Sequence, residues 1–417
     1  MYVADSRASA PAHGTARPTA GRRRAAVAPT VVALGTVSLV TDVSSEMVTA
    51  VLPLYLVTGL GLSPLGFGLL DGVYNGFSAL VRLVGGHLAD RGGGRHKWVA
   101  GLGYGISALC KPLLLVAHSL TPIGAVLAAD RTGKGLRTAP RDALISLSST
   151  PQTRGRAFGV HRAMDTAGAL LGPLAAFLIL RATVDGYDAV FAVSGCVAAL
   201  GLLVLVLFVP GGRRTAPPGE RPTLRAAVAL LRHRDLRRIT VCALLLGLAT
   251  VSDSFVYLLL RRRLGVPDRW FALLPLGTAA AFLLLAVVFG RLADRVGGWT
   301  VFLAGHGALL LAYALLLTSW HGIGLPYLVL ALHGAFYAAT DGVLMAAASG
   351  SVPERLRSSG LAVVQTGQAL TRFACSLLFG AAWTAWGDRA ALAGAAVALA
   401  GCAAFSLTLR PARTVTA

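Results

Sequence analysis

Six charged side chains are concentrated in the segment DRTGKGLRTAPRDALI, residues 130–145, of a chain that is otherwise mostly apolar. In a helix that turns 100° per residue, four of them share a stripe about 60° wide. These four are Asp130, Lys134, Arg137 and Arg141, and Arg131 and Asp142 lie at the edges of the same face. Charges at membrane depth are costly, so they face water or a partner and mark a solute pathway, a proton relay or an ion-pair network.

Acidic residues in other apolar segments could neutralise these bases. Asp42 and Glu46 belong to the apolar stretch 29–57, and Asp253 and Asp341 place one charge in each of two further stretches. Asp42 and Lys134 each lie about 20 Å along the axis from the predicted start of their helix, so they share a depth. Burial disfavours an ionised carboxylate whereas a neighbouring cation favours it. Such a set could therefore couple proton release to solute movement.

Nine residues are consequently candidates for solute binding or ion coupling: Asp42, Glu46, Asp130, Arg131, Lys134, Arg137, Arg141, Asp253 and Asp341. The competing interpretation is a structural ion-pair network that fixes how the helices pack. Arg141 and Asp142 approach the cytoplasmic surface in the topology predicted below. They could instead belong to an inner gate.

Enzymatic chemistry has little support in the sequence. The tripeptide GKG at 133–135 lacks the upstream glycine and the following Ser or Thr of a phosphate-binding loop. His161 and Asp165 have no nucleophile or third ligand spaced with them. The five cysteines occur singly, without metal-ligand spacing. We therefore expect no enzyme, no bound metal and no organic cofactor.

The composition indicates which elements must position the candidate residues. Hydrophobic residues make up 55% of the chain and charged residues 13%, and the mean hydropathy is +0.68. Such a chain has too little polar surface to cover a soluble globule. We therefore expect an integral membrane protein.

Apolar stretches of about 20 residues, long enough to cross a bilayer as helices, recur along the chain. We predict twelve such spans in an all-α fold, because the strict alternation of a membrane β-barrel is missing. The predicted spans are 29–57, 65–88, 97–118, 121–148, 156–181, 187–209, 238–262, 269–292, 299–319, 323–349, 358–384 and 389–409.

The formal net charge of +20 could indicate a nucleic-acid partner, so its location along the chain matters. Most of the 38 Lys and Arg residues fall in the tails and in the loops on one side of the predicted helices. Short basic loops stay in the cytoplasm, so both termini and the loop 211–236 are expected there, and no nucleic acid is expected. The segment RRRLGVPDR, 261–269, falls on the outer side instead. Either its arginines extend to lipid headgroups, or the seventh span is shifted.

An internal repeat divides the chain into halves. GHLADRGGG at 86–94 and GRLADRVGG at 290–298 are nearly identical and stand about 200 residues apart, near half the chain length. We therefore predict two six-helix pseudo-repeats. The predicted parts are a cytoplasmic tail at 1–28, a six-helix bundle at 29–210, a basic cytoplasmic linker at 211–237, a second six-helix bundle at 238–410 and a cytoplasmic tail at 411–417.

The first copy of the repeat resembles the loop signature between helices 2 and 3 of the major facilitator superfamily. The matching residues are Gly86, Leu88, Ala89, Asp90, Arg91, Gly93 and Arg95, whereas Gly94 replaces a usual basic residue. In that family this loop latches the two halves, so the resemblance implies gating roles. The implied gating residues are Asp90, Arg91 and Arg95, with Asp294 and Arg295 in the second copy and Asp142 at the inner end of its helix.

A second resemblance concerns Gly168, Gly172 and Pro173, which fit the G-x-x-x-G-P pattern of the antiporters of the superfamily. The match is partial, because Ala175 and Ala176 stand where the fuller motif has glycine. Small residues four apart also permit close helix packing, and a proline bends a helix. Plain packing therefore explains this motif about as well as antiport does.

These resemblances imply a secondary active transporter that moves a small solute by alternating access, with proton-coupled antiport or efflux preferred. A proton-coupled importer of an anionic metabolite or chelate is the alternative, and a transporter-like sensor or a membrane enzyme is a remote one. We expect a monomer in the bacterial inner (plasma) membrane. Its partners would be a small solute and the lipid bilayer, and an ion gradient, with protons preferred, would take the place of a cofactor.

Overall fold

The computed structural model describes residues 28–91, 96–150, 153–184, 186–211, 232, 234–319, 322–350 and 357–409. Every element of secondary structure within these ranges is helical. The prediction of an all-α chain is thereby confirmed. The predicted linker falls largely outside the described residues, so the domain boundaries stay predictions.

Long helices joined by short connections form the first half of the chain. They are α1 (Pro29–Leu54), which continues as the π-helical turn η1 (Tyr55–Gly59), α2 (Pro64–Arg91), α3 (His96–Leu113), α4 (Leu120–Leu147), α5 (Arg154–Ala182) and α6 (Gly186–Phe208). Pro29 occupies the first turn of α1, where its missing N–H costs no helical hydrogen bond. Pro53 lies inside α1, just before η1, and an internal proline removes one such bond and bends the helix.

The second half contains more interruptions. Its helices are α8 (Arg234–Ala249), α9 (Asp253–Leu264), α10 (Asp268–Phe271), α11 (Leu274–Val296), α12 (Gly298–Leu317), α13 (Leu325–Gly350) and α14 (Arg357–Thr408). Gly387 divides α14 at φ 83° and ψ 167°, a conformation that glycine adopts without a steric penalty. This kink falls in the predicted gap between the spans 358–384 and 389–409.

The seventh predicted span, 238–262, is divided into α8 and α9 by residues 250–252. The Val251 N–H donates a 2.8 Å hydrogen bond to the Tyr313 hydroxyl. The Cys375 thiol donates to the Thr250 carbonyl at 3.1 Å. Backbone groups that leave the helical ladder need such partners when they are buried. The interruption is therefore a stabilised feature, and it places Asp253 in the first turn of α9.

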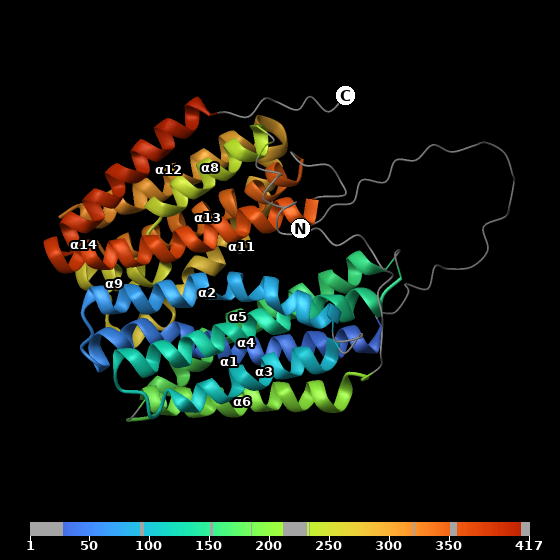
Figure 1. Cartoon of the computed structure of the whole chain (residues 1–417). Helices are drawn as coiled ribbons and strands as arrows, with labels where there is room; N and C mark the ends of the chain where they lie inside the picture. The colour runs from blue at the N-terminus through green and yellow to red at the C-terminus, as the bar shows by residue number, and fades with distance from the viewer. Residues whose placement is uncertain are drawn as a thin grey trace, which may run out of the picture.

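The helices form two groups that meet along α2 and α14. Figure 1 shows α1 to α6, in blue to green, below α8 to α14, in yellow to red, with α2 and α14 adjacent where the groups meet. A Cβ on Gly68 would lie 2.4 Å from the Ser376 carbonyl oxygen, and one on Gly380 would lie 2.5 Å from the Pro64 carbonyl oxygen. Glycine at both positions therefore permits the close approach of the two backbones.

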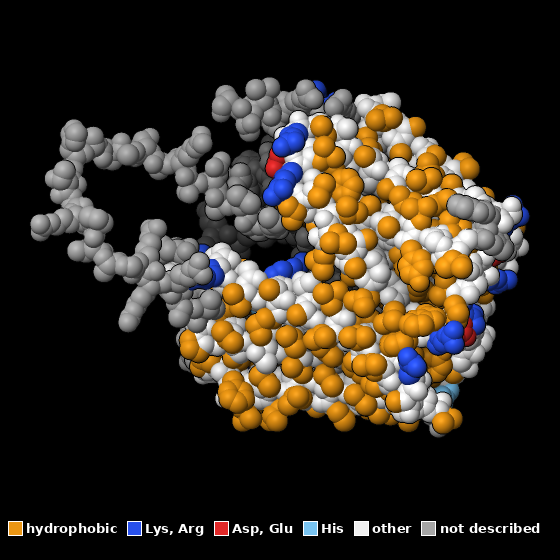
Figure 2. Space-filling view, turned by 180° about the vertical axis from the view of Figure 1, so that it is seen from behind, with side chains coloured by type: hydrophobic (Ala, Val, Ile, Leu, Met, Phe, Trp, Pro, Cys, Tyr) orange, Lys and Arg blue, Asp and Glu red, His pale blue; other side chains and the backbone are white. Residues whose placement is uncertain are grey.

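Apolar side chains cover the face of the molecule shown in Figure 2. Leu284 is 77% exposed, Val397 73% and Leu109 68%, which suits contact with lipid chains and not with water. Eight helical segments of the described chain are long and apolar enough to cross a membrane. Each of the twelve predicted spans overlies a helix, but the segments in α2, α3 and α4 are not among those eight. The number of crossings stays a prediction.

The arginines of RRRLGVPDR lie at the end of α9, where Gly265 adopts φ 66°. Arg261 forms an ion pair with Asp268. Arg262 and Arg263 each approach Asp388 at 3.7 Å. The helix also ends two residues beyond the predicted span, at Leu264. Acidic partners at the same end of the molecule thus balance these charges, an arrangement that neither sequence-based explanation included.

Candidate functional site

A cavity of about 310 Å³ lies between the two helical groups, a size within the range of small-molecule sites. Its lining comes from α1, α2, α9, α11 and α13. The lining residues are Glu46, Thr49, Pro53, Tyr74, Asn75, Asp253, Ser254, Tyr257, Pro275, Thr278, Ala279, Phe282, Tyr337 and Asp341. Three of the nine predicted coupling residues are therefore brought to one cavity, namely Glu46, Asp253 and Asp341.

Close packing of α5 on α1 positions Glu46. A Cβ on Gly168 would lie 2.4 Å from the Leu39 carbonyl oxygen, and one on Gly172 would lie 2.6 Å from Glu46 Cβ. The two glycines of the antiporter-like motif, followed by the buried Pro173, thus let α5 lie directly against the segment of α1 that carries Glu46. Glu46 itself forms no ion pair within 4 Å in the described part of the chain.

Asp253 is held by two side chains of α13. The Tyr337 hydroxyl donates to Asp253 Oδ1 at 2.5 Å, and His333 Nε2 lies 3.2 Å from the same oxygen. The His333 side chain is 1% exposed, whereas that of Asp253 is 43% exposed. The carboxylate therefore faces the cavity with an imidazole and a phenol behind it.

The charged cluster around Asp130 is buried between α3 and α4. Lys111 Nζ lies 2.9 Å from Asp130 Oδ1, and Arg131 lies 2.5 Å from Asp130 Oδ2. The Arg131 guanidinium also stacks 3.7 Å from the ring centroid of Tyr74, and the Tyr74 hydroxyl bonds to Thr49. Asp130 and Arg131 are thus linked to the cavity through Tyr74 and Thr49, and the Arg131 charge also acts on Glu46.

The remaining bases of α4 turn toward α1, α3 and α5. Arg137 lies 3.7 Å from Asp42 and stacks 4.5 Å from the Tyr104 ring centroid. Arg141 pairs with Asp142 at 3.0 Å and approaches Asp165 at 3.7 Å. Lys134 forms no ion pair within 4 Å among the described residues, although its charge acts on both Asp42 and Glu46. The predicted stripe does lie on one helix, but most of its side chains contact other protein groups and not the cavity.

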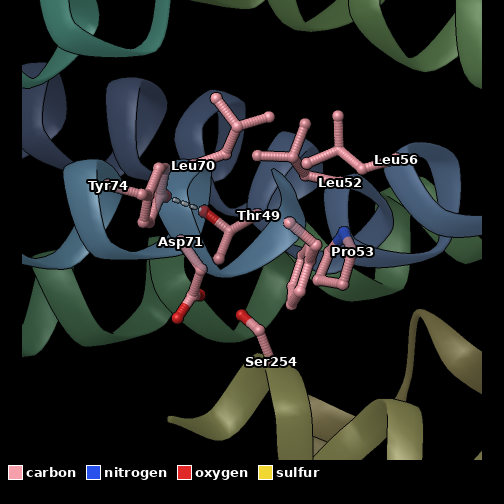
Figure 3. A pocket seen from close by; sticks show the side chains of 9 residues that line it. Thr49, Leu52, Pro53, Leu56, Leu70, Asp71, Tyr74 and Ser254 are labelled. Carbon is pink, nitrogen blue, oxygen red and sulfur yellow. Dashed lines mark hydrogen bonds between the residues drawn. The ribbon is translucent and has the colours of Figure 1, made fainter. Parts of the chain in front are cut away.

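A second, water-sized space of about 20 Å³ adjoins the cavity and shares Thr49 and Tyr74 with it. Figure 3 shows Asp71 and Ser254 of α9 near each other on one side of this space, with Leu52, Leu56 and Leu70 on the other. Ser376 of α14 donates a 2.6 Å hydrogen bond to Asp71 Oδ2. This buried bond joins the two helical groups, and the sequence-based assignment had not included Asp71 in the site.

Aromatic contacts between the two groups gather at the end of the molecule where α9 and α10 meet. The Phe67 ring of α2 packs edge-on against Phe255 of α9 at 4.8 Å between centroids. The Phe177 ring of α5 stacks on Trp270 of α10 at 5.4 Å. Each pair joins one helical group to the other at that end of the molecule.

The predicted gating residues are only partly visible. The side chains of Asp90 and Arg91, and the whole of Arg95, lie outside the described part of the structure. Asp294 and Arg295 are exposed in the last turn of α11. Asp142 forms the ion pair with Arg141 described above. The latch function stays a prediction.

His333 and Tyr337 are site residues that the sequence analysis missed. Together with Asp341 they recur every four residues along α13, which places them along one side of a helix. This polar series in an otherwise apolar stretch was the available signal. One histidine and one tyrosine do not indicate a site by themselves. Their partner Asp253 is a neighbour in space but lies in a distant part of the sequence.

The helical groups, the apolar surface and the charged cavity between them define a multi-pass membrane protein built for solute transport. The chain belongs to the Major Facilitator Superfamily, whose family model matches residues 34–376. It is 30% identical over 360 residues to an uncharacterized MFS-type transporter of Methanocaldococcus jannaschii, covering 84% of this chain and 87% of that protein. An uncharacterized protein of Mycobacterium tuberculosis is 34% identical over 186 residues, or 45% of this chain and 42% of that protein.

Solved transporters share the fold. The crystal structure of the nucleoside transporter NupG has a TM-score of 0.77 at 14% identity, covering 91% of this chain and 98% of that one. A bacterial homolog of the human lysosomal transporter Spinster, in an inward-facing and occupied conformation, has a TM-score of 0.75 at 17% identity, covering 91% and 96%. At these identities the likeness extends to the fold alone.

Proposed function

We propose that this member of the superfamily exports a small solute in exchange for protons, by alternating access across the bacterial inner membrane. The observation that carries the proposal is the cavity between the halves, to which each half contributes a carboxylate: Glu46 from α1, and Asp253 and Asp341 from α9 and α13. Ionisable groups at membrane depth mark solute and proton pathways. Twelve crossings in two six-helix repeats, with both termini in the cytoplasm, complete the proposal.

Glu46 is the best candidate for the proton-coupling carboxylate. It lines the cavity, whereas Asp42 is engaged with Arg137 at 3.7 Å. Lys134 acts on Glu46 electrostatically but forms no ion pair within 4 Å in the described chain. An approaching solute can therefore change the balance between Glu46 and Lys134, and a carboxylate that loses its cation takes up a proton more readily.

In the proposed cycle of alternating access, the aromatic contacts between the two groups close one end of the cavity in one state and separate in the other. Separation of Phe67 from Phe255, and of Phe177 from Trp270, would open the cavity at that end while the opposite end closes. The proposed topology makes the closed end the outer one. A change between two states of this kind requires a ligand that binds one state better than the other, and the carboxylates of both halves supply such differential contacts.

Proteoliposomes carrying an internal pH-sensitive dye test this proposal. Addition of a transported solute should move protons in wild-type vesicles. In Glu46→Gln vesicles, solute exchange should continue while proton movement is lost. Asp188→Asn is the matched control, because Asp188 is an exposed acid in the first turn of α6. Solute transport that leaves the internal pH unchanged in the wild type would refute proton coupling.

The alternative, import of an anionic metabolite, needs cations on the surface that the solute touches. Among the described residues that line the cavity there is no Lys or Arg. We therefore prefer export.

A further inference from the structure

We propose that the solute is an organic cation with an apolar or aromatic body, held between Asp253 and Asp341 of one half and Glu46 of the other. This inference rests on the proposed transport function and adds the chemical class of the solute. Sequence patterns alone favoured neither charge, because α4 contributes mostly bases and α1 contributes acids.

The surface that a solute would touch is acidic. The Asp, Glu, Lys and Arg side chains among the described lining residues are three, and all three are carboxylic acids. The cations that act on these acids are not among the lining residues: Lys134, Arg131 and Lys111 act on Glu46, and Arg372 and Arg162 act on Asp341. None of these cations approaches a lining carboxylate within 4 Å, since no such ion pair occurs in the described residues.

Asp253 is prepared for a ligand by its partners. The Tyr337 hydroxyl donates to Asp253 Oδ1, and His333 Nε2 lies close to the same oxygen. The other oxygen, Oδ2, receives no hydrogen bond or ion pair from the described part of the chain. Both ring nitrogens of His333 are buried without a hydrogen-bond partner, and Nε2 lies 3.2 Å from Asp253 Oδ1, so the imidazole approaches this carboxylate without a formed hydrogen bond. A fixed carboxylate with one free oxygen facing a cavity is suited to accept a hydrogen bond from an ammonium group or to pair with a quaternary one.

Aromatic rings supply the second half of the recognition. Tyr257, Phe282 and Tyr337 line the same cavity as the three acids, and ring faces attract cations, more strongly where water is excluded. Tyr257 is held in place because its hydroxyl donates to Thr278 at 3.1 Å. Tyr74 already has Arg131 over its ring at 3.7 Å. The molecule thus uses the same interaction in the wall of the cavity.

The cavity distinguishes an organic cation from a metal ion. Its volume of about 310 Å³ far exceeds that of a bare ion and suits a small organic molecule. Pro53, Pro275 and Ala279 add apolar contact area to the lining. The described residues also hold no group of three His, Cys, Asp or Glu side chains placed to ligate a metal.

Saturable binding of charged probes to the full-length protein in lipid nanodiscs tests the inference. Tetraphenylphosphonium and tetraphenylborate have the same shape and opposite charges, and benzyltrimethylammonium serves as a smaller cation. We expect saturable binding of at least one cation, with tetraphenylborate binding more weakly than tetraphenylphosphonium. Asp253→Asn and Asp341→Asn should each weaken cation binding roughly tenfold or more, because each removes a negative charge that would pair with the bound cation.

Asp188→Asn should bind the cation like the wild type, and a monodisperse elution profile of every variant establishes that it is folded. Three results would each overturn the inference: tetraphenylborate binding at least as tightly as tetraphenylphosphonium, no saturable binding of either cation, or cation binding that persists unchanged in Asp253→Asn, Asp341→Asn and Glu46→Gln. These measurements need no gradient and no turnover. A protein that binds cations but moves no protons would therefore refute the antiport proposal alone.

Discussion

Among single residues, the charged side chains of α1 and α4 have different tasks. Asp130 accepts from Lys111 and Arg131 and is 3% exposed, so its environment is that of a structural ion pair. Glu46 faces the cavity and has no ion pair among the described residues. The sequence allowed two interpretations, a coupling site and a structural ion-pair network. Glu46 supports the first and Asp130 supports the second.

Asp130→Asn should destabilise the protein strongly, because Lys111 and Arg131 would remain as buried cations without a counter-charge. Removing one member of a buried pair costs about 3 kcal/mol or more. Heating in detergent followed by size-exclusion chromatography should show earlier loss than for the wild type. Asp142→Asn is the control, since that side chain is 44% exposed and its loss should cost far less. Equal heat resistance of the two variants would remove the structural role from Asp130.

His333→Gln and His333→Phe separate positioning from packing. Glutamine retains a hydrogen-bond donor toward Asp253, whereas phenylalanine retains ring volume and loses the donor. Cation binding should therefore be near the wild-type affinity in His333→Gln and several-fold weaker in His333→Phe. The reverse order, with phenylalanine as the better substitute, would mean that His333 contributes volume and not a polar contact.

At the scale of elements, interruptions of helices place the site. The break between α8 and α9 brings Asp253 to the start of a helix, where the macrodipole favours a negative charge. Pro53 and the π-helical turn η1 bend α1 beside the cavity. The glycines of α2 bring it close to α14. These irregular positions let helices from both halves contribute to one cavity.

Gly68→Ala should push α2 away from α14, because the added Cβ would meet the Ser376 backbone at 2.4 Å. Gly66→Ala is the matched control, since its Cβ would meet only side chains at 3.5 Å. The spacing of α2 and α14 can be followed with cysteines placed at Leu65 and Thr384, in a protein without other cysteines. In the native chain the Leu65 N–H donates a 3.0 Å hydrogen bond to the Thr384 hydroxyl. The disulfide should form readily with Gly66→Ala and slowly with Gly68→Ala. Equal rates would show that the contact is not tight.

In the molecule as a whole, two groups of helices share one cavity, and aromatic contacts join the groups near the end where α9 and α10 meet. The groups are also joined by the buried bond from Ser376 to Asp71. Transport by a rocking motion requires that these contacts form and break together, because packed interfaces switch between discrete arrangements. The proposed topology decides which side of the membrane this end of the molecule faces.

Reporter fusions test that topology. A reporter fused after Arg221 should behave as cytoplasmic, and one fused after Gly186 should behave as external, because basic loops stay inside. With this topology, a fluorescent-protein reporter should be active after Arg221 and inactive after Gly186, and a phosphatase reporter should show the reverse. Both reporters on one side of the membrane would contradict the twelve-helix arrangement.

The helical fold class and the family could be predicted from local patterns in the sequence. Apolar runs of spanning length define helices whatever their neighbours are, so every predicted span overlies a helix. The loop signature at 86–95 and the glycine motif at 168–173 indicated the superfamily, and the family model confirms it. Such patterns are local, so they can be read without knowing which helices touch.

Which charges meet depends on how the helices pack, and the sequence does not show this. One face of α4 carries Asp130, Lys134, Arg137 and Arg141. Three of these side chains form ion pairs with three different helices: Asp130 with α3, Arg137 with α1 and Arg141 with α5. Asp253 of α9 also forms one group with His333 and Tyr337 of α13, which lie far from it along the chain. A periodic pattern gives the direction of a side chain around its own axis, but not the helix that packs there. The acidic character of the cavity, and with it the expected charge of the solute, therefore depends on the packing of the two halves.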